Sequence, residues 1–227
     1  EAAFLLIHTV IMADLVQNGK KWHGTVWQTM TCIRKRWIIG RAFIMDRIKR
    51  KDRILKYQGS ILNIYDDVML LPDGSDGHWD YVEHRNGAAA ALPVLSDGRI
   101  VLVRQYRNAL EREVLEIPAG AKTDPSESSA ACAAREMEEE IGYHAGKLEK
   151  LLTTATTGAF CNECIDVYLA MDLRKTVQHL DEEEILNVEC WELEDLCQMI
   201  FSGELIDAKT IAAILAYKVY KNKRVGI

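Results

Sequence analysis

The sequence predicts an α+β protein made of short strands, one central helix and a helical C-terminal end. Three observations carry this prediction. Turn residues divide 53–84 into short apolar runs, two further apolar runs flank Asp97-Gly98 as in a hairpin, and apolar residues recur at helical spacing from Ala130 to Ile141. The chain has 227 residues, of which 48% are hydrophobic, so it is long enough to bury a core.

The first segment, 1–48, is expected to be an N-terminal extension, and we hypothesise that it is not part of the native protein. Internal Met45 is followed by a stretch that resembles an ordinary protein start. The apolar residues near the beginning are broken by His8 and Asp14 and are too few to span a bilayer. The rest of the chain divides into a small β-sheet region at 49–87 and a main domain at 88–227.

Charge and cysteine content restrict the class of protein. The formal net charge is −6, which argues against a general nucleic-acid binder. The 6 cysteines are spread too thinly for a disulfide scaffold, so we interpret them as reduced thiols and expect a cytoplasmic protein without membrane attachment.

The main domain is expected to begin with central strands at 88–95 and 100–103. Arg104 and Arg107 follow the second of these strands, and guanidinium groups suit phosphate oxygens. The alternative interpretation is that both arginines are solvated surface residues. A further strand is expected at 114–120, ending in Pro-Ala-Gly.

The central helix is expected to begin with Asp124 as the N-cap and Glu127 in a capping box, and to end at Gly142. After it, strands are expected at 148–157, 165–171 and 185–193. The C-terminal end is expected to form a helix at 193–202 and a second helix capped by Asp207.

Three carboxylates, Glu136, Glu139 and Glu140, crowd one flank of the central helix. Residues three and four apart are neighbours on a helix, where like charges repel unless a cation compensates them. Glu136 and Glu140 lie about a quarter-turn from the apolar stripe, so we expect them at the rim of the sheet rather than buried in the core. A solvated acidic face is the alternative to a cation site.

The run Arg135-Glu136-Met137-Glu138-Glu139-Glu140-Ile141-Gly142-Tyr143 resembles the sequence box of the Nudix hydrolases. Seven residues separate Glu127 from Arg135, as the box requires, whereas six residues instead of five separate Gly120 from Glu127. The segments VLVRQYRNALEREVLEIPAG, TTGAFCNECIDVYLA and SGELIDAKTIAAI are similar to the ADP-ribose pyrophosphatase branch. This resemblance implies a mixed β-sheet sandwiched between helices in an α/β/α arrangement, with a small antiparallel sheet before it.

The resemblance also implies a metal site. Its ligands would be Glu136, Glu140 and the carbonyl of Ala119, with Glu139 as a further ligand or a helper in proton transfer. The implied ion is Mg²⁺, with Mn²⁺ as an alternative. Four residues would be structural in the box: Gly120, Glu127, Arg135 and Gly142.

Residues outside the box would bind substrate and supply the base. The resemblance implies substrate contacts by Arg107 and Arg104, and by Glu163 in the loop 158–164. Glu116 is expected to contact either the substrate or the protein. Glu184 is the expected catalytic base and Glu183 the alternative, although the acidic run around them also reads as a solvated loop.

The implied function is metal-dependent hydrolysis of the diphosphate bond of ADP-ribose to AMP and ribose 5-phosphate. Another nucleotide sugar such as GDP-mannose is an alternative substrate, and an inert module that only binds ADP-ribose is a second class of function. The resemblance implies a homodimer formed through 49–87. It also implies that an aromatic residue such as Trp79 or Tyr65 holds the adenine.

Overall fold

The computed structural model describes residues 48–181 and 184–225, so the predicted extension lies almost wholly outside the described residues. The described residues group into two compact units. The smaller unit contains 48–51 and 68–77, and the larger contains 52–67 and 78–225. In the smaller unit, Lys51 pairs with Asp76, with 2.7 Å between Nζ and Oδ1.

The expected small antiparallel sheet is present. Its strands lie in the order β1-β2-β3, with bounds β1 Lys49–Gln58, β2 Leu62–Leu70 and β3 Asp76–His84. Within the larger unit, Arg53 pairs with Asp67 and stacks its guanidinium carbon 3.6 Å from the centre of the Tyr81 ring. Because this ion pair and cation–π contact join β1, β2 and β3, they stabilise the sheet.

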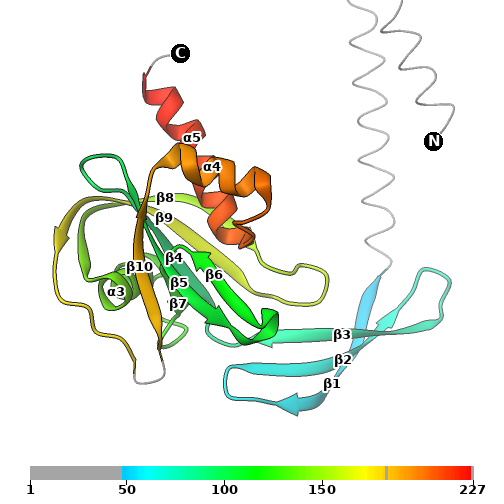
Figure 1. Ribbon diagram of the computed structural model, residues 1–227. Coiled ribbons are helices and arrows are strands. Elements are labelled where there is room, and N and C mark those ends of the chain that lie inside the picture. The colour runs from blue at the N-terminus through cyan, green and yellow to red at the C-terminus, as the bar shows by residue number, and fades with distance from the viewer. Residues whose placement is uncertain (1–47, 182–183, 226–227) are drawn as a thin grey trace, which may run out of the picture. The chain divides into compact units, whose positions relative to one another are not determined.

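Two further sheets and three helices complete the larger unit (Figure 1). One sheet has the strand order β10-β5-β6 and the other β7-β4-β9-β8, in which β4 and β9 are parallel and the other pairs are antiparallel. The bounds are β4 Ala88–Pro93, β5 Ile100–Arg107, η1 Asn108–Leu110, β6 Arg112–Glu116, β7 Ala119–Ala121, α3 Ser129–Ile141, β8 Tyr143–Ala155, β9 Cys164–Lys175, β10 Leu186–Trp191, α4 Leu193–Ser202 and α5 Ala208–Val225.

The core lies on both faces of the central strand β4, every residue of which is buried. Successive side chains of a strand point to opposite faces. Ala89 and Ala91 accordingly pack with Met137 of α3, whereas Ala90 and Leu92 pack with residues of α4 and α5. Helices therefore cover both faces (Figure 1), which confirms the predicted α+β class and the α/β/α layering.

The strand expected at 114–120 is wrong in one respect, because the chain forms two strands there. β6 ends at Glu116 and pairs with β5, whereas β7 begins at Ala119 and pairs with β4 in the other sheet. The break falls at Ile117-Pro118, and proline has no N–H to continue a ladder. The crossing places Glu116 and the Ala119-Gly120 backbone three residues apart at the junction of the two sheets.

The expected start of the central helix is also wrong. Helix α3 begins at Ser129, with Ser128 as the N-cap accepting a hydrogen bond from the Ala131 amide at 3.1 Å. Asp124 instead accepts from the Ser126 amide at 2.7 Å and closes a local turn. The expected end is confirmed, because Gly142 caps the helix with φ of 65°, a value that favours glycine.

The C-terminal helices agree with the prediction. Asp207 precedes α5 and accepts a hydrogen bond from the Thr210 amide at 2.9 Å, as expected of a cap. None of the helices within the described ranges is long and apolar enough to cross a membrane.

Candidate functional site

Helix α3 presents two buried carboxylates toward the glycine loop. Glu136 is 8% exposed and Glu140 is 3% exposed, so the expectation that they stay at the rim is wrong. Burial raises the pKa of Glu136, and it raises the pKa of Glu140 to about 8 with help from the charges of Glu136 and Glu184. Each carboxylate is therefore costly to ionise without a cation nearby.

Gly120 is the residue that makes room for these carboxylates. A Cβ atom at this position would lie 2.2 Å from the carboxyl carbon of Glu136. The neighbouring amide of Ala119 donates a hydrogen bond to Glu140 Oε2 at 3.2 Å. The backbone of β7 thus approaches α3 closely at this one place, and only glycine allows the approach.

Arg135 holds the acidic side chains together. Its Nη1 atom donates at 2.8 Å to Glu136 Oε1 and at 2.8 Å to Glu139 Oε2. Its Nη2 atom donates to the carbonyl of Ala121 at 3.0 Å. The guanidinium therefore partly compensates the repulsion between the carboxylates and fixes α3 to the glycine loop.

Glu127 is part of the same network. It accepts from Arg135 Nε at 3.2 Å and from the Thr123 amide at 2.8 Å. The hydrogen bond from Arg135 is the main reason that the pKa of Glu127 is lowered, and Thr123 adds to this effect. Glu127 does not form the expected capping box, because it lies before the helix and binds the loop.

A second charged cluster lies at the end of β6. Glu116 is 3% exposed and accepts two hydrogen bonds from Arg107, at 2.6 Å from Nε and 2.7 Å from Nη2. Lys209 of α5 also donates to Glu116. Burial alone would raise the pKa of Glu116, but the hydrogen bonds from Arg107 and the charge of Lys209 outweigh it and the pKa is lowered. The cluster therefore contains an ionised, doubly paired carboxylate.

Arg104 belongs to a different face of β5 from Arg107, since the two are three positions apart in the strand. Its Nε and Nη2 atoms donate to Glu189 of β10 at 2.5 and 3.1 Å. Trp191 also donates to Glu189, at 2.9 Å. The structure thus separates the two arginines that the sequence analysis grouped together.

The acidic run reaches the site through Glu184. The charge of Glu184 contributes to the raised pKa of both Glu136 and Glu140, which indicates that its carboxylate lies within electrostatic range of theirs. Its Oε2 atom accepts from the Asp181 amide at 3.3 Å. The alternative base, Glu183, lies outside the described residues.

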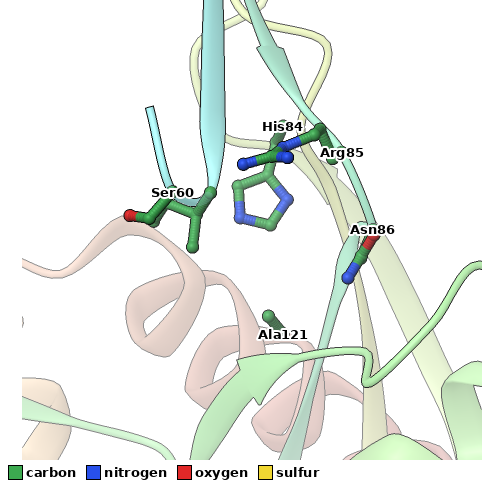
Figure 2. Close-up of a pocket in the computed structure, with 6 residues that line it drawn as sticks. Ser60, His84, Arg85, Asn86 and Ala121 are labelled. Carbon is green, nitrogen blue, oxygen red and sulfur yellow. The ribbon is translucent and has the colours of Figure 1, made fainter. Parts of the chain in front are cut away.

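The loop 158–164 is attached to the end of β3. Asn162 Oδ1 accepts from the His84 amide at 2.7 Å, and Glu163 Oε1 lies 3.7 Å from His84 Nε2. A hollow of about 130 Å³ opens beside His84 (Figure 2), whose ring lies between Ser60 and Asn86. His84 Nδ1 is buried and has no hydrogen-bond partner within the described residues. Glu163 is therefore placed beside β3.

A larger hollow of about 860 Å³ lies between β2, β3 and the loop residues 158–161. Trp79 lines it and is 48% exposed. Tyr65 instead donates its hydroxyl to Glu83 at 2.9 Å. Of the two aromatic residues expected to hold the adenine, Trp79 is thus the one with a partly exposed ring that lines a cavity.

The residues around Gly120 fit a hard cation. Carboxylate and backbone carbonyl oxygens are the ligands that Mg²⁺ prefers. Arg135 neutralises Glu136 and Glu139, whereas Glu140 is paired with the neutral amide of Ala119, so ionising Glu140 leaves a buried negative charge for a cation to compensate. Among the described residues, no three acidic, histidine or cysteine side chains are already arranged to hold a metal. Three of the carboxylates, those of Glu127, Glu136 and Glu139, instead pair with Arg135.

Two charged partners were missed by the sequence analysis, Glu189 and Lys209. Neither is near its arginine or glutamate partner in sequence, so no local pattern indicates the pairs. One signal for Lys209 was present, since a lysine in the first turn of a helix opposes the helix dipole. A nearby acid offsets this unfavourable interaction, and in the structure Lys209 pairs with Glu116 and Asp207.

The fold and the acidic helix are shared with a known class of proteins, which comparison with solved structures and sequence relatives identifies. The structure is similar to the crystal structure of an ADP compounds hydrolase, with a TM-score of 0.70 and 19% identity, covering 80% of this chain and 97% of that one. The NUDIX domain model matches residues 84–214. This chain belongs to the Nudix family and is a Nudix hydrolase.

Two sequence relatives indicate the range of that family. The ADP-ribose pyrophosphatase of Bacillus subtilis (strain 168) is 39% identical over 160 residues, which are 70% of this chain and 85% of the relative. The methanol dehydrogenase activator of Bacillus methanolicus is 34% identical over 160 residues, with the same shares of 70% and 85%. Hydrolysis of a nucleoside diphosphate compound is the activity that these similarities support.

Proposed function

We propose that this chain hydrolyses ADP-ribose to AMP and ribose 5-phosphate in a reaction that depends on Mg²⁺. The observation that carries the proposal is the buried carboxylate pair of Glu136 and Glu140 against the Gly120 backbone. The identity of 39% to an ADP-ribose pyrophosphatase supports the choice of substrate. In this proposal the main domain at 88–227 performs catalysis.

The ligands of the ion are Glu136, Glu140 and the carbonyl of Ala119, with Glu139 as an additional ligand; Mn²⁺ is the alternative ion. When bound, such an ion neutralises phosphate charge and lowers the pKa of a water molecule. The buried position of Glu140 supports this assignment, because its ionised form lacks a positively charged partner in its own hydrogen bond.

Arg107 binds a substrate phosphate. Glu116 occupies the Nε and Nη2 edge of its guanidinium, which leaves the Nη1 side free to donate to phosphate oxygens. The side chain of Arg107 is 41% exposed, which supports access to a ligand. Glu116 acts by orienting Arg107. Arg104 and Glu163 are further substrate contacts in this proposal.

Glu184 removes the proton from the attacking water. Water adds to one phosphorus atom, the bond from that phosphorus to the bridging oxygen breaks, and the bridging oxygen leaves on the other phosphate. Glu139 assists proton transfer, and Glu183 is the alternative base. The electrostatic influence of Glu184 on Glu136 and Glu140 supports its nearness to the reacting atoms.

The active form is a cytoplasmic homodimer that associates through 49–87. Large apolar side chains are exposed on this region of the larger unit, namely Ile54, Leu55, Tyr57, Ile61 and Trp79. Burying them against a second copy would remove apolar surface from water. Light scattering should give the mass of a dimer, and a monomer at micromolar concentration would reject this part of the proposal.

The test is a panel of nucleotide sugars with Mg²⁺ in which released AMP or GMP is measured. ADP-ribose should give the highest kcat/KM. A higher value for GDP-mannose would assign the alternative substrate to the same site. Hydrolysis of none of the panel, together with binding of ADP-ribose, would favour the inert binding module.

A further inference from the structure

Lys209 occupies an unusual position beside the cluster of Arg107 and Glu116. It lies in the first turn of α5, 93 residues after Glu116, and its side chain is only 11% exposed. Its ammonium group donates to Glu116 and lies 3.2 Å from Asp207 Oδ2. A buried lysine loses hydration, so its retention at this position requires compensating interactions.

Anchoring of the helix does not by itself explain this lysine. The start of α5 is already attached to the sheet junction by Thr210, whose hydroxyl accepts from the Ile117 amide at 2.9 Å and donates to Asp207 at 2.5 Å. These neutral and charge-assisted hydrogen bonds fix the helix end without Lys209. The ammonium group compensates the charge of Glu116, whose pKa it lowers, and also pairs with Asp207.

Glu116 has two cationic partners, Arg107 and Lys209, which differ in their exposure to solvent. The side chain of Arg107 is 41% exposed, whereas that of Lys209 is 11% exposed, and both cations donate to Oε2 of Glu116. Without Lys209, the negative charge of Glu116 would be compensated by Arg107 alone. Arg107 would then attract a phosphate more weakly, because its positive charge would be cancelled at close range.

We propose that Lys209 is a positioning residue that compensates Glu116 and so keeps the charge and orientation of Arg107 available to a phosphate group. The inference rests on the proposed function, since it deepens the account of the phosphate-binding arginine. Lys209 acts through Glu116 and Arg107 and does not touch the substrate itself.

The experiment combines Lys209→Gln and Lys209→Met with Arg107→Met in a double-mutant cycle. The glutamine variant removes the charge but keeps a hydrogen-bond donor. It therefore serves as the test if the methionine variant is too unstable to measure. Lys218→Met is the matched control. Lys218 lies on the same helix, and its ammonium pairs with Glu194, at 2.7 Å, instead of with Glu116. The readouts are KM and kcat for ADP-ribose, the Kd of ADP by calorimetry, and Tm.

Lys209→Gln should raise KM and the ADP Kd by about tenfold and leave kcat within about threefold. In the Arg107→Met background the same change should have almost no further effect, because the residue through which it acts is gone. Lys218→Met should change neither constant.

A lower Tm for both Lys209 variants with unchanged KM and Kd would show a merely structural lysine and overturn the inference. Equal losses with and without Arg107 would also overturn it. If the wild type hydrolyses no nucleotide sugar, the proposed function fails, but the cycle of ADP affinities still decides whether Lys209 acts through Arg107. Failure of the wild type to bind ADP would overturn both.

Discussion

Replacing Glu140 by glutamine should stabilise the protein in the absence of metal while abolishing most of its activity. The carboxyl has an ordinary pKa of 4.5, and in the folded protein the pKa is raised to about 8. Between these values the folded state retains a proton that the unfolded state releases. The stability that this group contributes is therefore complete below pH 4.5 and is lost as pH rises toward 8.

The size of the effect follows from this window. A pH of 7.5 lies about 3 pH units above the ordinary pKa of 4.5. At about 1.36 kcal/mol per unit, the wild type has lost about 4 kcal/mol of stability at this pH. The glutamine does not titrate, but its buried NH₂ group costs about 1–3 kcal/mol if it lacks an acceptor. We expect a net gain of about 1–3 kcal/mol at pH 7.5. The amide cost does not depend on pH, so the gain should grow by about 1.4 kcal/mol per unit between pH 5.5 and 7.5.

Urea unfolding in EDTA at pH 5.5, 6.5 and 7.5 measures this difference. Glu138→Gln is the control, because Glu138 lies on the same helix and its carboxylate is 41% exposed. Its unfolding free energy should follow that of the wild type at each pH. Parallel pH profiles for Glu140→Gln and the wild type would refute the reasoning. Added Mg²⁺ should stabilise the wild type and have little effect on the variant.

Three further variants test the remaining parts of the site. Glu184→Gln should lower kcat about 100-fold without changing the affinity for Mg²⁺, measured by steady-state kinetics and metal titration; unchanged turnover would reject Glu184 as the base. Gly120→Ala should cost about 1–3 kcal/mol in urea unfolding, because its Cβ would overlap the Glu136 carboxylate; an undisturbed Tm would contradict the close approach. Arg135→Met should destabilise the protein by about 3–5 kcal/mol, because buried carboxylates lose their counter-charge. Stability equal to the wild type would show that the acids do not depend on this guanidinium.

The features that sequence predicts here are those set by local rules. The end of α3 at Gly142 follows from the backbone conformation that glycine permits, and the alternating and continuous apolar runs identify the strands. The wrong helix start has a local cause as well. Asp124 and Ser128 are both suitable caps, but Asp124 binds the Ser126 amide in a turn, which leaves the capping position to Ser128.

The features that sequence could not predict depend on contacts between distant segments. Burial of Glu136 and Glu140 arises because β7 approaches α3 at Gly120, and helical spacing alone cannot report that approach. Pairing of Arg104 with Glu189 depends on β10 lying beside β5. The box pattern identifies which residues matter, whereas their electrostatic states follow from the tertiary structure.

The longer glycine loop shows how the local sequence and the tertiary contacts together determine the site. Six residues separate Gly120 from Glu127, one more than the family pattern has. The additional length is contained in a turn, since the Glu127 amide donates to the Asp124 carbonyl at 3.1 Å. Gly120 still lies against Glu136, and Glu127 still reaches Arg135 at 3.2 Å. Because both ends of the loop retain their contacts with α3, the insertion changes the path of the chain between them and leaves the carboxylate site intact.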